Sequence, residues 1–224
     1  MYPRLILLTL LIGVCPLFGG DYQLDPKQSI FAVVTQKAGF AAALAHNHFI
    51  AADPVTVNIS CEADPATLQL SFSTQVEDLI VDDPTRTQTW TPRVQALSFL
   101  NGEFSEVSEK DSGKIRKAML GKKQLQADKH KEITAKLVSV TAKDGKQGSV
   151  AFSHQLEMDI TITGKTVRKT ILANIALEGN RLNIEAFTPL AFSEFDIKAY
   201  SAAFGAVANE DTFYLLVHLE AEGT

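Results

Sequence analysis

The chain has 224 residues, of which 46% are hydrophobic and 21% charged, with a formal net charge of −5 and two cysteines. This composition is ordinary for a globular protein and argues against an intrinsically disordered chain. The sequence has no dominant basic patch, which argues against nucleic-acid binding, and the lysine-rich stretch 114–136 is interpreted as a solvated helix face and turn.

The N-terminus has the pattern of a secretory signal peptide. Arg4 is the only charged residue before an apolar run at residues 5–14. This run is shorter than the ~20 residues that span a bilayer, so a cleaved signal is favoured over an anchor. We expect a signal peptide at residues 1–20 and a mature domain at residues 21–224 in the periplasm.

The number of cysteines in the mature chain depends on where this signal is cleaved. Cleavage near Gly19 or Gly20 would remove Cys15 and leave Cys61 alone, so the mature chain would have no internal disulfide. A lone thiol in an oxidising compartment is expected to be buried and structural. A lipoprotein signal at Cys15 is the alternative interpretation of the same segment.

Period-two alternation predicts several strands in the first third of the chain. Apolar and polar side chains alternate at residues 55–60 and 68–76, as they do along a strand with one buried face. A further strand is predicted at residues 30–36. The stretch 39–50 is ambiguous because its alanines would permit a helix, but its neighbours favour a turn into a strand.

The middle of the chain is less regular. Pro84 and Pro92 interrupt residues 79–101, which we predict to be a loop with a single helical turn near its end. Apolar residues at helical spacing among lysines predict a helix within residues 108–125.

A long hairpin at residues 148–177 is the clearest element. Its first arm alternates over 13 residues, from Val150 to Ile162, whereas a typical strand has ~5–6 residues. Gly164-Lys165 supplies the turn, because glycine tolerates the positive φ of a tight reversal. Such hairpins are typical of strongly bent sheets and barrels.

Further strands surround this hairpin. We predict them at residues 133–141, 182–192 and 213–219, with a turn at Asp144-Gly145 before the hairpin and an irregular segment at residues 199–209. About eight strands with short connections and no β–α–β spacing predict an all-β fold. The expected architecture is an antiparallel β-barrel of about eight strands with one or two short helices inserted.

Five segments follow one another in the order and spacing of a known family. They read YQLDPKQSIFAVVTQKAG, AHNH, IRKAMLGKKQLQADKHKEITAKLVSV, LEMDITITGKTVRKTILANIAL and EAFTPLAFSEFDI. On these segments the mature chain resembles the YceI-like proteins, secreted bacterial proteins associated with binding of polyisoprenoids or other long-chain lipids. The resemblance implies a lipocalin-like β-barrel around a hydrophobic tunnel that holds an isoprenoid quinone or a similar lipid.

We therefore expect the protein to bind a long-chain hydrophobic ligand for carriage or storage in the periplasm. A polyisoprenoid, an isoprenoid quinone or a fatty-acid derivative would be its only bound group, with peripheral or no membrane contact. A monomer and a homodimer both stay open. The inward-facing positions predicted to line the tunnel are Leu68, Leu70, Phe72, Phe152, His154, Leu156, Met158, Ile160, Ile171, Ile175, Phe213, Leu215 and Val217.

A solid core is the alternative for these apolar positions. Periodicity does not distinguish a filled barrel from a tunnel, since the interiors of small barrels are commonly filled by side chains. On this alternative the protein is a structural barrel without a ligand, and His154 is a hydrogen-bonded core histidine and not a contact for a lipid headgroup.

His46 and His48 suggest a second kind of ligand. Residues two apart on a strand share a face, so the two imidazoles could bind a metal or a haem. Zinc would need a third or fourth ligand, for which His154 is a candidate and Cys61 a weaker one. Two histidines alone are too few, so a hydrogen-bonding role at a barrel rim or in its interior is preferred.

The sequence gives no positive case for catalysis. It contains no G-x-S-x-G, H-E-x-x-H or C-x-x-C motif. The acidic pair Asp82-Asp83 is interpreted as a solvated turn. We therefore expect a binding protein and not an enzyme.

Overall fold

A computed structural model describes residues 20–224 of the chain, so the predicted signal peptide lies almost entirely outside the described residues. One antiparallel sheet dominates the fold. Its strands are β1 (Gly20–Leu24), β2 (Ile30–Ala38), β3 (His48–Ala52), β4 (Thr56–Cys61), β5 (Gln69–Gln75), β6 (Leu79–Val81), β7 (Glu132–Gln147), β8 (Val150–Ile162), β9 (Lys165–Glu178), β10 (Arg181–Ala191), β11 (Ser201–Ala202) and β12 (Val207–Gly223).

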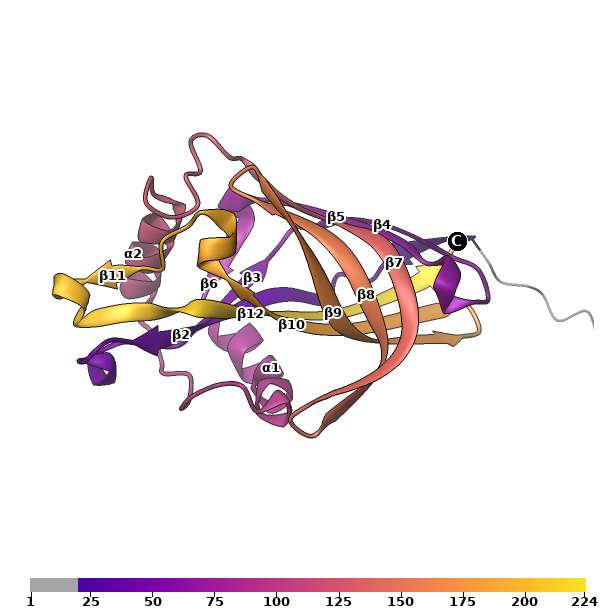
Figure 1. Cartoon of the computed structure of the whole chain (residues 1–224), viewed down its shortest axis with the longest axis horizontal. Helices are drawn as coiled ribbons and strands as arrows, with labels where there is room; N and C mark the ends of the chain where they lie inside the picture. Colours follow the sequence, from indigo (N-terminus) through magenta and orange to yellow (C-terminus); the bar gives the residue numbers. More distant parts are fainter. Residues whose placement is uncertain (1–19) are drawn as a thin grey trace, which may run out of the picture.

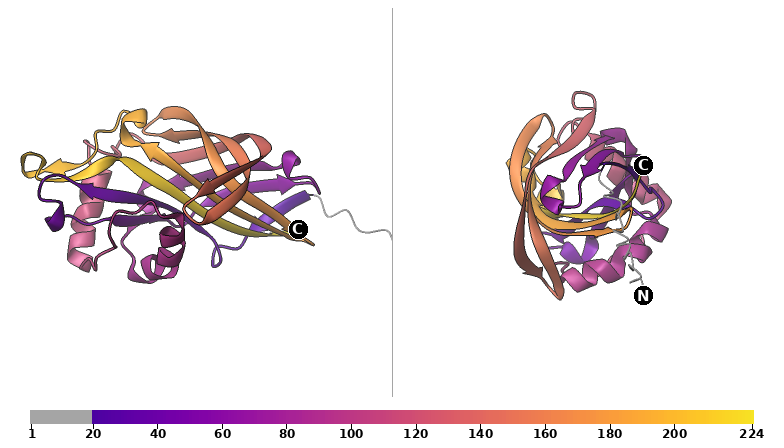
Figure 2. Two further views of the ribbon diagram at one scale, coloured as in Figure 1. Left: turned by 60° about the horizontal axis from the view of Figure 1, so that its bottom comes forward. Right: turned by 90° about the vertical axis from the view of Figure 1, so that its right-hand side faces the viewer.

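Eight of these strands close into a barrel. They follow the order β1-β4-β5-β7-β8-β9-β10-β12, and β12 pairs with β1 to complete the ring. Figure 2 shows this ring of strands in its right-hand view, with helices against the outside. The antiparallel barrel predicted from the strand spacing is confirmed.

The long last strand, β12, joins this barrel to an extension of the sheet. Near its C-terminal end β12 pairs with β1, while residues closer to its start pair with β2. The strands β3 and β6 continue the sheet beyond β2. Helix α2 (Glu109–Leu120) packs against β6 at this end, opposite the C-terminus (Figure 1).

The predicted central hairpin is confirmed as β8 and β9. Thr163 and Gly164 turn the chain with φ values of 51° and 75°, and the two strands pair from Ile162↔Lys165 onward. The predicted turn at Asp144-Gly145 is wrong, because β7 continues through it to Gln147. Two shifts in the β7–β8 register absorb the extra residues, so the strand bends instead of ending there.

A loop was predicted where the structure has helix α1 (Pro84–Leu97). The Asp83 carboxylate accepts a hydrogen bond from the Arg86 amide at 2.8 Å, and Pro84 occupies the first turn, where no backbone donor is required. Pro92 lies inside the helix, but Val94 and Leu97 are completely buried against the outside of the barrel. This burial outweighs the low helix propensity of the segment.

Helix α2 confirms the helix expected within residues 108–125. The Ser108 hydroxyl caps it by accepting from the Asp111 amide at 3.2 Å. Among residues 20–224, no helix is sufficiently long and apolar to cross a membrane.

Strand alternation produces two apolar layers. On β2, Phe31 belongs to the core inside the barrel, whereas Val34 belongs to a second core between the sheet and α1. Phe99 extends this outer core by stacking on Tyr214, with ring centroids 4.2 Å apart. The helix and the segment after it therefore cover one outer face and leave the interior face to the barrel.

Candidate ligand cavity

The barrel encloses an apolar cavity of about 340 Å³. Ligand pockets commonly have volumes of ~300–1,000 Å³, so this cavity has the size of a small-ligand site. Side chains of α2, including Ile115 and Met119, form part of its wall beside the inner faces of the barrel strands. Nine of the predicted tunnel positions line it: Leu70, Phe72, Leu156, Met158, Ile160, Ile171, Phe213, Leu215 and Val217.

The other four predicted positions lie elsewhere. Leu68 and Ile175 are buried in the packed core that also contains Tyr22 and Ala221, where β1 meets the end of β12. There side chains fill the barrel, as the solid-core alternative expected for the whole interior.

Phe152 and His154 do not line the cavity, because β8 bends away from β9 at this end. The pairing of β8 with β9 runs only as far as His154↔Ala173, and Phe152 belongs to the outer core beneath α1. One face of a coiled strand can therefore line the cavity at one end and pack under a helix at the other. The Nδ1 atom of His154, a half-buried residue, lies 2.8 Å from the Ser153 hydroxyl.

His46 and His48 do not form a metal site in the described structure. Their ring centroids are 6.3 Å apart, and only His48 belongs to β3. Residues 20–224 contain no group of three or more His, Cys, Asp or Glu side chains that could hold a metal ion. Neither His154 nor Cys61, which is buried, supplies the third ligand that the metal hypothesis required.

His48 instead forms a hydrogen bond with Asp82 at the cavity wall. Its Nδ1 lies 2.7 Å from one carboxylate oxygen of Asp82, and the other oxygen accepts from the Phe49 amide at 2.9 Å. The interpretation of Asp82-Asp83 as a solvated turn is wrong, since the Asp82 side chain is only 8% exposed. The chain returns along β3 as β6 and places this carboxylate beside the histidine.

Thr35 is a second polar group on the same wall. It lies directly opposite His48 in the β2–β3 pairing, and both residues line the cavity. Thr35 is 2% exposed, and its hydroxyl has no hydrogen-bond partner among residues 20–224. Thr74, another cavity threonine, differs because its hydroxyl donates to the Pro54 carbonyl at 3.0 Å. The sequence analysis missed Thr35, although its period-two phase with Phe31 could have indicated an inward side chain.

Tyr200 and Asn209 line the cavity near two exposed phenylalanines. Tyr200 is 39% exposed and immediately precedes β11. Phe40 is 86% exposed, and Phe204 projects fully from the tip of the neighbouring loop. The two loops touch, since the Ala41 amide donates to the Ala206 carbonyl at 2.9 Å.

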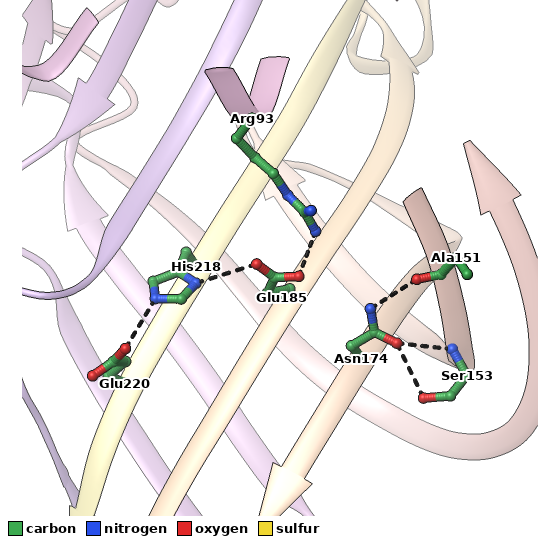
Figure 3. Close-up of polar contacts among 7 residues, drawn as sticks. All are labelled: Arg93, Ala151, Ser153, Asn174, Glu185, His218 and Glu220. Atoms are coloured by element: carbon green, nitrogen blue, oxygen red, sulfur yellow. Dashed lines mark hydrogen bonds and ion pairs between the residues drawn. The ribbon is translucent and has the colours of Figure 1, made fainter. Parts of the chain in front are cut away.

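A separate polar cluster lies on the outer face of the barrel, beneath α1 (Figure 3). Arg93 of α1 forms an ion pair with Glu185 of β10, and His218 of β12 lies 3.6 Å from the same carboxylate. The other ring nitrogen of His218 lies 3.3 Å from Glu220, and the Trp90 ring packs beside it with centroids 5.3 Å apart. These contacts tie the helix to the barrel and do not face the cavity.

The charges in this cluster shift the titration of both partners. The contact with Glu185 raises the pKa of His218 and outweighs the opposing effect of burial. The same contact lowers the pKa of Glu185, with a further contribution from Arg93. Both shifts favour the charged pair in the folded protein.

Comparison with known proteins agrees with this architecture. A family model described as the YceI-like domain matches residues 22–221. The crystal structure of BcnA from Burkholderia cenocepacia is similar, with a TM-score of 0.57 and 14% identity over 88% of this chain and 99% of that one. A YCEI protein from Campylobacter jejuni has a TM-score of 0.50 and 12% identity, over 78% and 84% of the two chains. No curated protein matches the chain. At these identities the structural likeness shows the fold alone.

Proposed function

The chain belongs to the YceI-like family, and from this premise we propose that it binds a long-chain hydrophobic ligand in its barrel, for carriage or storage in the periplasm. The ligand would be a polyisoprenoid, an isoprenoid quinone or a fatty-acid derivative. The expected role is binding and not catalysis.

The apolar cavity carries this proposal. Its wall is built from inward-facing side chains of strands and of α2, with few polar groups among them. A hydrocarbon chain gains ~0.8 kcal/mol for each methylene moved from water to such surroundings. Ten buried methylenes would supply about 8 kcal/mol before the cost of ordering the ligand is subtracted. A plain apolar tunnel is therefore sufficient for useful affinity.

The exposed phenylalanines suggest how a ligand enters. Phe204 lies a few residues from the cavity residues Tyr200 and Asn209, and Phe40 lies on the loop that touches this segment through the Ala41–Ala206 hydrogen bond. Burying a phenylalanine side chain in an apolar phase gains ~1.5–3 kcal/mol. We propose that these two tips dock transiently on a lipid surface, so that the ligand passes into the barrel without crossing water.

The first test is the ligand content of the purified mature protein. Its mass is measured under native conditions, and any compound released on denaturation is identified. A stoichiometric lipid or quinone would support the proposal and name the ligand class. A protein that is empty and also fails to take up prenyl or acyl chains would refute it.

A further inference from the structure

Thr35 and His48 form a buried polar spot in the mainly apolar wall of the cavity, and Asp82 lies behind the histidine. Thr35 and His48 are paired across β2 and β3, and Asp82 is bound to the histidine ring from behind. The Thr35 hydroxyl is buried and unpartnered among the described residues. A buried hydroxyl without a hydrogen bond is costly, and a polar group of a bound ligand would satisfy it.

The carboxylate of Asp82 determines which ring nitrogen of His48 carries a proton toward it. An ionised carboxylate only accepts, so the Nδ1 atom of His48 carries the proton that points to Asp82. In the neutral ring, Nε2 is then left as an acceptor. The second carboxylate oxygen of Asp82 accepts from the Phe49 amide, and this bond holds the carboxylate beside the histidine ring.

The spot therefore offers one acceptor and one hydroxyl. A ligand hydroxyl can satisfy both, since it can donate to Nε2 of His48 and accept from the hydroxyl of Thr35. A carbonyl or an ether oxygen can only accept, and would leave Nε2 without a donor. A carboxylate would meet the lone pair of Nε2 and the negative charge of Asp82 behind it.

Lys114 does not change this preference for a hydroxyl headgroup over a carboxylate. It is a basic residue in the cavity wall and could in principle attract an anionic headgroup. Its ammonium already lies 2.7 Å from the Asp111 carboxylate, and its side chain is 65% exposed to solvent. Exposed and neutralised charges of this kind contribute little binding energy.

We propose that Thr35, His48 and Asp82 form a headgroup site that selects a neutral hydroxyl, as in a long-chain alcohol, a phenol or a hydroquinone, over carbonyl and carboxylate headgroups. This inference rests on the proposed function, because the chain of the same ligand would fill the apolar cavity. It names the headgroup class that the apolar wall alone leaves open.

The test compares three probes with the same tail: 1-decanol, decyl methyl ether and decanoate. Their dissociation constants are measured by calorimetry on the purified mature protein. We expect 1-decanol to bind roughly tenfold or more tightly than the other two, since one buried polar group left unpaired weakens binding by about that factor. Equal affinities for the three probes would overturn the headgroup site while leaving lipid binding intact. Failure of all three to bind would refute the proposed function itself.

Two variants and one control assign the selectivity to these residues. Thr35→Val keeps the shape of the side chain, and we expect it to reduce the preference for 1-decanol at least several-fold. Thr74→Val is the matched control: Thr74 also lines the cavity, but its hydroxyl is bonded to Pro54, so the preference should not change. An unchanged preference in folded Thr35→Val would overturn the proposal.

Asp82→Asn provides a readout that a purely structural role would not give. The amide oxygen can still accept from Phe49, while its nitrogen donates to Nδ1 of His48, so the other tautomer places a donor on Nε2. Decanoate and the ether should then gain affinity relative to 1-decanol, reversing the order. If the folded variant binds the three probes in the same order of affinity as the natural protein, His48 does not contact the headgroup and the proposal is wrong.

Discussion

Replacing Ala186 with phenylalanine tests whether the cavity is a ligand site or a packing defect. Ala186 lies on β10 between Ala173 and Val217, is buried, and faces the cavity. In a filled core, a small-to-large change of this kind costs about 1–3 kcal/mol. Here the ring would enter open space of about 340 Å³, so we expect a loss of less than about 1 kcal/mol in the free energy of unfolding.

The same change should abolish ligand uptake. A phenyl ring would displace roughly six carbons of a bound chain, each worth ~0.8 kcal/mol, so the affinity should fall by about 5 kcal/mol, or more than 10³-fold. Ala176→Phe is the control, because Ala176 is exposed on the neighbouring strand β9. Urea unfolding and titration with a fluorescent long-chain alcohol measure the two effects. A destabilised Ala186→Phe protein with unchanged uptake would refute the assignment of the cavity as the ligand site.

Three further changes test other parts of the structure. Asn47→Ala should lower the free energy of unfolding in urea by about 2–4 kcal/mol, because buried Asn47 accepts from the Lys37 amide and donates to the carbonyls of Asn101 and Glu103; a neutral effect would contradict this. The raised pKa of His218 means that its ion pair stabilises the fold fully below the unfolded pKa of ~6.5 and less as the pH rises through the folded pKa. The difference in unfolding free energy between the natural protein and His218→Gln should therefore stay constant below the unfolded pKa of ~6.5 and narrow as the pH rises above it in urea titrations, whereas a widening difference would show the opposite linkage. Changing Phe40 and Phe204 together to serine should slow lipid uptake from vesicles about tenfold while leaving affinity in detergent unchanged, and an unchanged vesicle rate would exclude docking by these loops.

The strands could be predicted because each carries its own signal. The alternation from Val150 to Ile162 and the glycine after it specify the β8–β9 hairpin without reference to the rest of the chain. Helix α1 could not be predicted in this way. Its segment contains Pro92 and several threonines, so besides the cap at Asp83 and Pro84 the helix depends on burial of Val94 and Leu97 against the barrel.

The sequence by itself determined which side chains of a strand share a face, since period two is a local property of a strand. Only the tertiary structure decided what each part of that face contacts. Ile171 lines the cavity, whereas Ile175, in the same phase of the same strand, is buried in the core without lining it. Phe152 lies under α1 because β8 coils away from β9.

The polar spot shows the same division between local and long-range information. A threonine in phase with apolar neighbours could be recognised from sequence as inward-facing, but nothing local distinguishes Thr35 from Thr74. The difference arises from partners far along the chain: Pro54 satisfies Thr74, whereas Thr35 faces His48, whose ring is fixed by Asp82 34 residues away. Hydrogen bonds between distant residues form only when the sheet closes, so their pairing is a property of the folded barrel and not of any one segment.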